Sequence, residues 1–265
     1  MASRLTRRAY RAEQRLFLTE GPQAVREALG VPGCVREIFA TSGSLERHPD
    51  IAALVAVERT VLHQCDELTL ASLAGSISPQ GIVAVCRFVD VPLDEALGPA
   101  ARLVVVAAHV RDPGNAGSLI RCADAAGADA VIFAGSSVDP YNDKAVRASV
   151  GSLFHLPVVA GTTVEATVTA LRTRRLTVLA ADGAGEDTVD DLLATGALNG
   201  GIAWMFGNEA WGLTEDDRRL CDRVVAVPIY GRAESLNVAT AAAVCLYATA
   251  RTQRASPPDG GVSSS

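Results

Sequence analysis

Polar residues follow several apolar runs in this chain, and their types could do chemistry together. The stretch RDPGNAGSLIR, residues 111–121, carries Asn115 and, six residues later, Arg121. The stretch FGNEAWGL, residues 206–213, places Glu209 just after an apolar run, and SLNV, residues 235–238, supplies Ser235 and Asn237. A guanidinium, a carboxylate and neutral polar groups could bind a substrate oxygen and stabilise negative charge that develops on it.

Each of these residues also has a simpler interpretation. Arg121 could be a solvated or ion-paired residue of a helix start, and Ser235 could be the N-cap of the last helix. Glu209 could face the positive end of a helix that begins near Thr214. The loop after residue 108 has neither GxGxxG nor GxxxxGK, which weighs against a nucleotide-dependent oxidoreductase despite the strand, loop and helix found there.

The elements that must position these residues form a βαβ pattern. In an open parallel sheet, ligands bind outside the carboxyl ends of the strands. Leu103–Ala108 is a wholly apolar strand, followed by a Gly/Pro loop, a helix over Ser118–Ala126 and a strand over Ala130–Ala134. Further strands are expected at Leu176–Ala181, Gly201–Phe206 and Val224–Pro228, with a helix from Asn237 to about Arg251. The pattern predicts an α/β fold with a parallel sheet.

A separate small α/β unit precedes this region. Its expected helices cover Pro22–Leu29, Pro49–Val57 and Asp66–Ala74, and its expected strands are Val35–Ala40, Thr60–His63 and Ile82–Val89. Residues 90–101 contain two prolines and a glycine and predict a linker. Residues 1–15 are rich in arginine and predict either a solvated helix or an arm that contacts phosphates. The tail, residues 254–265, is too poor in apolar residues to fold, and we expect disorder there.

Composition sets outer limits on the function. The chain has 265 residues, is 49% hydrophobic and carries a net charge of −6, which argues against binding to nucleic acid by bulk charge but leaves room for a local basic surface. The six cysteines lie singly, without a CxxC pair, and predict a reduced, metal-free protein in the cytoplasm. No secretory signal or long apolar run is present, so we expect no membrane association.

Taken in order, the three polar stretches resemble the SpoU/TrmH class of the SPOUT superfamily. Members of this class are RNA ribose 2′-O-methyltransferases that use S-adenosylmethionine. The first family motif has Asn followed six residues later by Arg, as in Asn115 and Arg121. The second is a Gly-Asn-Glu turn, as in residues 207–209, and the third is the SLNV run at 235–238. DPYNDKAVRASVGSLFHLPV, residues 139–158, is similar to the segment between the first two motifs.

The resemblance implies a fold and partners that spacing alone does not. It implies a knotted methyltransferase domain over residues 101–253, with a deep trefoil knot, and a homodimer. FLTEGPQAVREAL at 17–29 and SPQGIVAV at 78–85 are similar to the family's substrate-binding domain, related to ribosomal L30e-type proteins, which we assign to residues 1–90. Such a domain usually accompanies 23S ribosomal RNA as the target. Transfer RNA and a non-catalytic role in RNA binding or ribosome assembly remain alternatives.

Site roles also follow from the resemblance, residue by residue. Arg121 is expected to stabilise charge on the ribose 2′-oxygen, oriented by Asn115 and Glu209, while the final proton acceptor stays open. Ser235 and Asn237 are expected to complete the polar wall. The S-adenosylmethionine contacts are expected mainly from backbone groups of four residues, namely Gly207, Ile229, Leu236 and Leu179. No metal is required.

Three further side chains, those of Trp211, His109 and His155, stand outside these roles. Trp211 stands where family members more often carry a smaller or polar residue, and it could stack on a base or pack within the fold. His109 and His155 lie beside apolar residues and predict core or edge histidines without a catalytic role.

Overall fold

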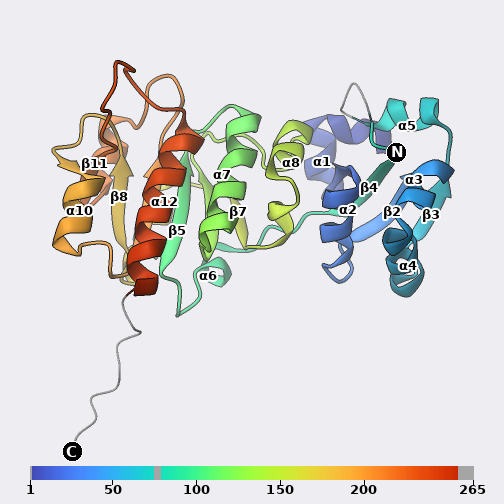
Figure 1. Cartoon of the computed structure of the whole chain (residues 1–265), viewed down its shortest axis with the longest axis horizontal. Helices are drawn as coiled ribbons and strands as arrows, with labels where there is room; N and C mark the ends of the chain where they lie inside the picture. Colours follow the sequence, from blue (N-terminus) through green and yellow to red (C-terminus); the bar gives the residue numbers. More distant parts are fainter. Residues whose placement is uncertain (1, 75–78, 256–265) are drawn as a thin grey trace, which may run out of the picture. The chain divides into compact units, whose positions relative to one another are not determined.

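The computed structural model describes residues 2–74 and 79–255 (Figure 1). Their contacts form two compact units. The first contains residues up to 91, together with 112–121 and 138–160, and the second contains 92–111, 122–137 and the residues from 161 onward. Helix α7 (Pro113–Ala126) contributes to both. The predicted tail lies, from residue 256, outside the described residues, and residues 254 and 255 end a helix.

The first unit is built on a four-stranded sheet with the order β1-β4-β2-β3. The strands are β1 (Leu16–Glu20), β2 (Val35–Ala40), β3 (Val61–Gln64) and β4 (Ile82–Arg87). β4 pairs antiparallel with β1 and β2, and its first five residues are buried. The helices of this unit are α2 (Pro22–Leu29), α3 (Ser42–Arg47), α4 (Pro49–Glu58) and α5 (Glu67–Leu73). The expected elements are present, and β1 and α3 are additions to them.

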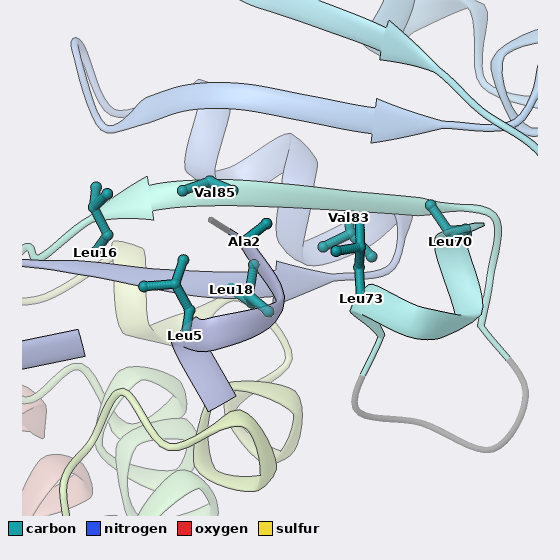
Figure 2. Close-up of a cluster of buried hydrophobic side chains, with 8 residues drawn as sticks. All are labelled: Ala2, Leu5, Leu16, Leu18, Leu70, Leu73, Val83 and Val85. Carbon is teal, nitrogen blue, oxygen red and sulfur yellow. The ribbon is translucent and has the colours of Figure 1, made fainter. Parts of the chain in front are cut away.

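The arginine-rich N-terminal segment packs against this sheet. It forms a short 3₁₀ helix (Ala2–Thr6) and α1 (Arg8–Gln14). Figure 2 shows Ala2 and Leu5 among the side chains of a buried apolar cluster that also contains residues of β1, β4 and α5. Arg11 is 2% exposed, and its guanidinium lies 2.7 Å from the Asp139 carboxylate. The expectation of a fully solvated helix is therefore wrong for the inner face of this segment.

Residues 139–158, the segment between the first two motifs, belong to the same unit. It contains α8 (Asp143–Ser149) and Tyr141, which is buried and stacks on Phe88 with ring centroids 3.8 Å apart. The Tyr141 hydroxyl donates to Asp90 and accepts from the Val89 amide, each at 2.9 Å. Burial raises the pKa of Tyr141 well above its usual value, so the hydroxyl stays protonated and keeps its donor role.

The second unit contains most of a seven-stranded sheet with the order β7-β6-β5-β10-β8-β11-β9, whose registered pairs are all parallel. The strands are β5 (Leu103–Ala108), β6 (Ala130–Ala134), β7 (Val158–Thr162), β8 (Thr177–Ala181), β9 (Asp187–Thr188), β10 (Ile202–Phe206) and β11 (Arg223–Ala226). Every residue of β5, β6 and β10 is buried, as apolar runs covered on both faces require.

Helices flank this sheet. They are α6 (Leu93–Ala96), α9 (Val164–Thr173), α10 (Val189–Thr195), α11 (Glu215–Leu220) and α12 (Val238–Ala255). α12 packs on β10, β5 and β8 and lies beside α7 (Figure 1), where the Tyr247 hydroxyl donates to the Ala125 carbonyl at 3.3 Å. In the part of the chain that the structure describes, no helix is long and apolar enough to cross a membrane.

Two local differences from the sequence prediction concern helices of the chain. α7 begins at Pro113 instead of Ser118, so Asn115 lies in the first helical turn and not in a loop. Proline is favoured in a first turn because its missing N–H would have no helical partner there. The expected linker contains the short helix α6, which the two prolines and the glycine of residues 90–101 concealed.

The strand β11 lies between β8 and β9, although β8 and β9 are neighbours in sequence. Residues 182–186, which connect β8 to β9, therefore pass across β11. The passage is tight: the Asp182 amide donates to the Val225 carbonyl at 3.1 Å. A Cβ at Gly185 would lie 2.7 to 2.8 Å from backbone atoms of residues 224–226, so only glycine fits there.

Candidate functional site

A pocket of about 500 Å³ opens at the carboxyl ends of β8 and β10, within the second unit. This volume falls in the range of small-molecule sites. Two loops supply most of its lining, residues 207–213 and residues 227–237. The lining residues include Ala181, Asp182, Gly183, Gly207, Asn208, Glu209, Trp211, Arg218, Ile229, Ser235, Leu236 and Asn237. The structure thus brings together six of the nine residues that the sequence assigned to a site.

The loop 207–213 is held by its own hydrogen bonds. The backbone groups of Asn208 and Gly212 bond to each other in both directions at 2.9 Å. The Asn208 side chain is buried, accepts from the Ala210 amide and donates to the His109 carbonyl at the end of β5, each at 2.9 Å. A Cβ at Gly207 would lie 2.3 Å from the Gly212 carbonyl carbon, so the loop closes only with glycine at this position. Asn208 therefore has a structural role in the site. The sequence places it in the Gly-Asn-Glu turn but assigns it no role.

Glu209 is exposed on this rigid loop, and its carboxylate accepts a hydrogen bond from the Arg111 amide at 3.2 Å. The helix that follows the loop, α11, has Thr214 as its N-cap, and the first-turn acids are Glu215, Asp216 and Asp217. Thr214 and Asp217 form a capping box. The alternative that Glu209 serves the dipole of this helix is therefore wrong.

Trp211 lies at the rim of the pocket and is 51% exposed. The Arg111 guanidinium carbon lies over its ring, 5.0 Å from the centroid, within the range of a cation–π contact. The indole is therefore not a core residue, which contradicts the alternative that it packs within the fold.

The loop 227–237 is less enclosed. Residues 229–237 are all exposed, and Ile229, Ser235 and Leu236 face the pocket. The Asn237 side-chain oxygen accepts from the Ala239 amide at 2.9 Å, at the start of α12. Asn237, and not Ser235, therefore has the local capping contact of this helix.

Leu179 does not belong to this lining. It lies in the middle of β8, is 1% exposed, and pairs with Trp204 of β10 on one side and Arg223 of β11 on the other. Ala181, two residues further along the same strand, lines the pocket instead.

Asn115 and Arg121 lie on α7 and are absent from the pocket lining. The backbone amide of Asn115 donates to the Asp112 carboxylate at 2.9 Å. The same carboxylate accepts a hydrogen bond from the Lys144 ammonium group at 2.8 Å. Arg121 is exposed. Its neighbour Cys122 contacts the Ala239 carbonyl with its sulfur at 3.6 Å, so this part of α7 lies against the first turn of α12.

Two further residues, Arg218 and His109, connect the segments around the pocket. Arg218 on α11 bonds the Asp182 carboxylate at 3.1 Å and the Leu213 carbonyl at 3.3 Å, which joins the end of β8 to the end of loop 207–213. His109 has a left-handed backbone, with φ of 59°, and its ring bonds Ser136 while its carbonyl holds Asn208. Sequence reasoning gave neither Arg218 nor His109 a role.

Residues 2–74 and 79–255 contain no cluster of three His, Cys, Asp or Glu side chains that could hold a metal ion. The six cysteines are free thiols, and burial raises the pKa of Cys221 and of Cys245 to about 12.

The pocket combines apolar side chains with three carboxylates, two side-chain amides, a hydroxyl and a guanidinium. Such a lining suits a small molecule that has both apolar and polar groups. Arg111, whose guanidinium lies over the Trp211 ring at the rim, is a cation that suits an anionic partner outside the pocket.

Comparison with known families identifies both parts of the chain. Residues 102–247 match the model of the SpoU rRNA Methylase family. Residues 18–92 match the model described as RNA 2′-O ribose methyltransferase substrate binding.

Individual proteins resemble the chain over most of its length. It is 34% identical over 255 residues to the 23S rRNA (guanosine(2553)-2′-O)-methyltransferase RlmP of Bacillus subtilis, covering 89% of each chain. The crystal structure of the SpoU methyltransferase AviRb from Streptomyces viridochromogenes in complex with AdoMet is similar with a TM-score of 0.84 and 30% identity, covering 96% of this chain and 98% of that one. An AdoMet-bound rRNA methyltransferase from Sinorhizobium meliloti gives a TM-score of 0.81 at 29% identity, covering 94% and 92% of the two chains.

Proposed function

The chain belongs to the SpoU rRNA Methylase family, and from this premise we propose that the pocket between loops 207–213 and 227–237 is its S-adenosylmethionine site. The protein is an RNA methyltransferase that transfers a methyl group to a ribose 2′-hydroxyl, with 23S ribosomal RNA as the target class. The observation that carries the assignment of the site is the convergence of the second and third motifs on one pocket at the strand ends.

The residues present fit this cofactor. Gly207, Ile229 and Leu236 would hold it through backbone groups and apolar contacts, because all three line the pocket. Gly183 also lines it, and a Cβ there would meet no atom within 4 Å, so the wall is open on that side. When bound, S-adenosylmethionine supplies an electrophilic methyl group.

Arg121 is the proposed residue that stabilises charge on the 2′-oxygen. A guanidinium stays protonated at any physiological pH, so it acts by electrostatic stabilisation and hydrogen bonding and not as a base. The contact between its neighbour Cys122 and Ala239 supports this role, because Ala239 lies two residues after Asn237 of the pocket wall.

Glu209 and Asn115 are proposed to orient the reacting groups. The Glu209 carboxylate accepts a hydrogen bond from the Arg111 amide, which holds it beside the pocket, and a carboxylate can bind a guanidinium or a ribose hydroxyl by charge-assisted hydrogen bonds. Asn115 lies six residues before Arg121 on α7, and its backbone amide is fixed by Asp112.

Ser235 and Asn237 are proposed to form the polar wall opposite loop 207–213. The Asn237 side-chain oxygen caps the start of α12. This contact fixes the position of the residues just before it, 234–236, which line the pocket. Ser235 then presents its hydroxyl from an exposed position.

The domain assignment, the knot and the homodimer are further parts of the proposal. Residues 1–90 would bind RNA, and residues 101–253 would carry the transferase and the trefoil knot. The knot is supported by the passage of residues 182–186 across β11. An exposed apolar strip on α12, with Val244 41% and Tyr247 55% exposed, supports a partner surface for a second copy. A cytoplasmic location follows from the proposed substrate.

A methyl-transfer assay tests the function and the site together. The purified protein is incubated with radiolabelled S-adenosylmethionine and with 23S ribosomal RNA or transfer RNA, and the product is mapped for 2′-O-methyl groups. We expect labelling of 23S ribosomal RNA, loss of about 100-fold or more in Arg121→Ala, and unchanged cofactor affinity in that variant. Arg219→Ala removes an exposed arginine of α11 and serves as the matched control.

Three outcomes would contradict parts of the proposal. Labelling of transfer RNA alone would show that the substrate is transfer RNA and not 23S ribosomal RNA. RNA binding without transfer by the wild-type protein would favour an assembly role. Full activity of Arg121→Ala would remove Arg121 from the mechanism.

A further inference from the structure

Trp211 and Arg111 form an aromatic and cationic pair at the rim of the pocket that the roles above do not use. We propose that this pair is a stacking subsite for an unpaired base of the RNA substrate, with the Trp211 indole as the platform. The inference deepens the proposed function and rests on it, because the site is taken to act on RNA.

The indole is presented by a rigid turn. Its loop is closed by the reciprocal backbone bonds between Asn208 and Gly212, and the buried Asn208 side chain ties the loop to β5. A platform that is fixed before binding loses little conformational entropy when a base stacks on it. The turn holds the Trp211 side chain beside the pocket with 51% of it exposed, so the ring is accessible to a base.

The pair is also connected to the proposed site. The guanidinium of Arg111 lies over the Trp211 ring, while the amide of Arg111 donates to Glu209. One residue thus links the indole to the carboxylate proposed to act at the ribose. Indole, guanidinium and carboxylate form one cluster whose chemistry matches the base, phosphate and ribose of a single nucleotide.

The opposite side of the indole is the place for the base. Because the guanidinium covers one face, a flat ring can add to the other and complete a stack. Unpaired bases in RNA are commonly bound by aromatic side chains and arginine planes in this way. Stacking does not read the edge of a base, so the subsite would select an unpaired nucleotide without selecting its identity.

The occupant that competes with an RNA base is the adenine of the cofactor, since Trp211 also lines the pocket. Two observations favour RNA. Trp211 lies on the exposed rim, whereas the buried ends of β8 and β10 form the floor. The partner of the indole is a guanidinium, which suits the phosphates of RNA better than the cationic sulfonium of S-adenosylmethionine.

Tryptophan fluorescence reads the subsite directly. The chain has two tryptophans, and Trp204 is fully buried with its ring N–H bonded to Thr249 at 2.9 Å. The emission of Trp211 is the difference between the full-length protein and its Trp211→Phe variant. We expect an adenosine hexanucleotide to quench this difference signal at least twofold, and a 12-base-pair RNA duplex of equal nucleotide concentration to leave it nearly unchanged. S-adenosylmethionine alone is expected to leave it unchanged.

Kinetics with 23S ribosomal RNA provide the second readout. We expect Trp211→Ala to lower kcat/KM for the RNA about tenfold or more, while the dissociation constant for S-adenosylmethionine changes less than about twofold. Trp211→Phe keeps an aromatic ring and is expected to recover most of the lost activity. Arg111→Ala keeps the backbone amide that bonds Glu209 and is expected to lower activity less than Trp211→Ala.

The outcomes separate this proposal from the proposed function. A wild-type protein that transfers no methyl group would overturn the function, and the fluorescence titration would still decide the subsite. Equal quenching by S-adenosylmethionine would assign the indole to the cofactor and overturn the subsite. Transfer by Trp211→Ala at the wild-type rate, with no quenching by the hexanucleotide, would also overturn it while leaving the function intact.

Discussion

The two loops that line the pocket are held in different ways. Loop 207–213 is closed by backbone bonds, a buried asparagine and a glycine that no other residue could replace. Loop 227–237 is exposed from residue 229 onward. Its side-chain hydrogen bonds include one from the Tyr230 hydroxyl to the Asp190 carboxylate and one from the Ala239 amide to the Asn237 side chain. The difference indicates that the first loop supplies fixed geometry and the second can adjust around a ligand.

Substitution of one glycine in each loop tests this difference most severely. In Gly207→Ala the new methyl group would meet Gly212 and Leu213 backbone atoms at 2.3 to 2.5 Å. We expect a loss of about 3 kcal/mol in the free energy of unfolding and loss of cofactor binding. Gly231→Ala in the other loop would meet no atom within 4 Å and is the matched control. Thermal unfolding measures the stability of the two variants, and calorimetric titration with S-adenosylmethionine measures their cofactor binding. Equal losses in Gly207→Ala and Gly231→Ala would refute the distinction between the loops.

Removal of one polar side chain from each loop should separate stability from turnover. Asn208→Ala leaves the His109 carbonyl and the Ala210 amide without their partner, so we expect a loss of about 2 kcal/mol in stability. Ser235→Ala, at an exposed position, should change stability by less than about 0.5 kcal/mol yet lower methyl transfer. Chemical denaturation and the transfer assay give the two values. A stable Asn208→Ala protein would show that the loop does not depend on this side chain.

The start of α12 should show a smaller, purely local effect. Asn237→Ala removes the acceptor for the Ala239 amide and is expected to cost about 1 kcal/mol of stability. Asn237→Asp keeps an acceptor oxygen and should retain that stability while testing whether the amide is needed for turnover. Equal unfolding midpoints for the Ala and Asp variants would exclude the capping role.

The smallest effect is expected from alkaline pH. The hydrogen bond to Asp190 raises the pKa of Tyr230 above its usual value. A group with a raised pKa in the folded state contributes stability below its unfolded pKa, near 10, and that contribution is lost as pH rises through the folded value. Loop 227–237 should therefore loosen at high pH before loop 207–213 does. The ultraviolet difference titration of wild type against Tyr230→Phe measures the pKa, and a value at or below 10 would contradict the tether.

Sequence patterns identified most of the elements because their periodicity is local. The apolar runs of β5, β6 and β10 and helices α2, α4 and α5 of the first unit are predicted nearly to the residue. The start of α7 was placed five residues late, because a Gly/Pro-rich stretch that usually marks a loop forms a helical first turn here. Segment 1–15 was predicted as solvated or RNA-binding, since the burial of Ala2 and Leu5 depends on a sheet formed by distant residues.

The sequence by itself determined the family, the motif residues and the strand ends at which a ligand would bind. It did so because residue types and spacings along the chain are enough to define motifs and periodic elements. Tertiary structure alone decided that Glu209 bonds the Arg111 amide, that Asn208 locks its loop, and that Leu179 is enclosed in the sheet. It also placed Trp211 on the surface beside Arg111. These facts depend on contacts between residues up to about a hundred positions apart, which no local pattern of side chains encodes.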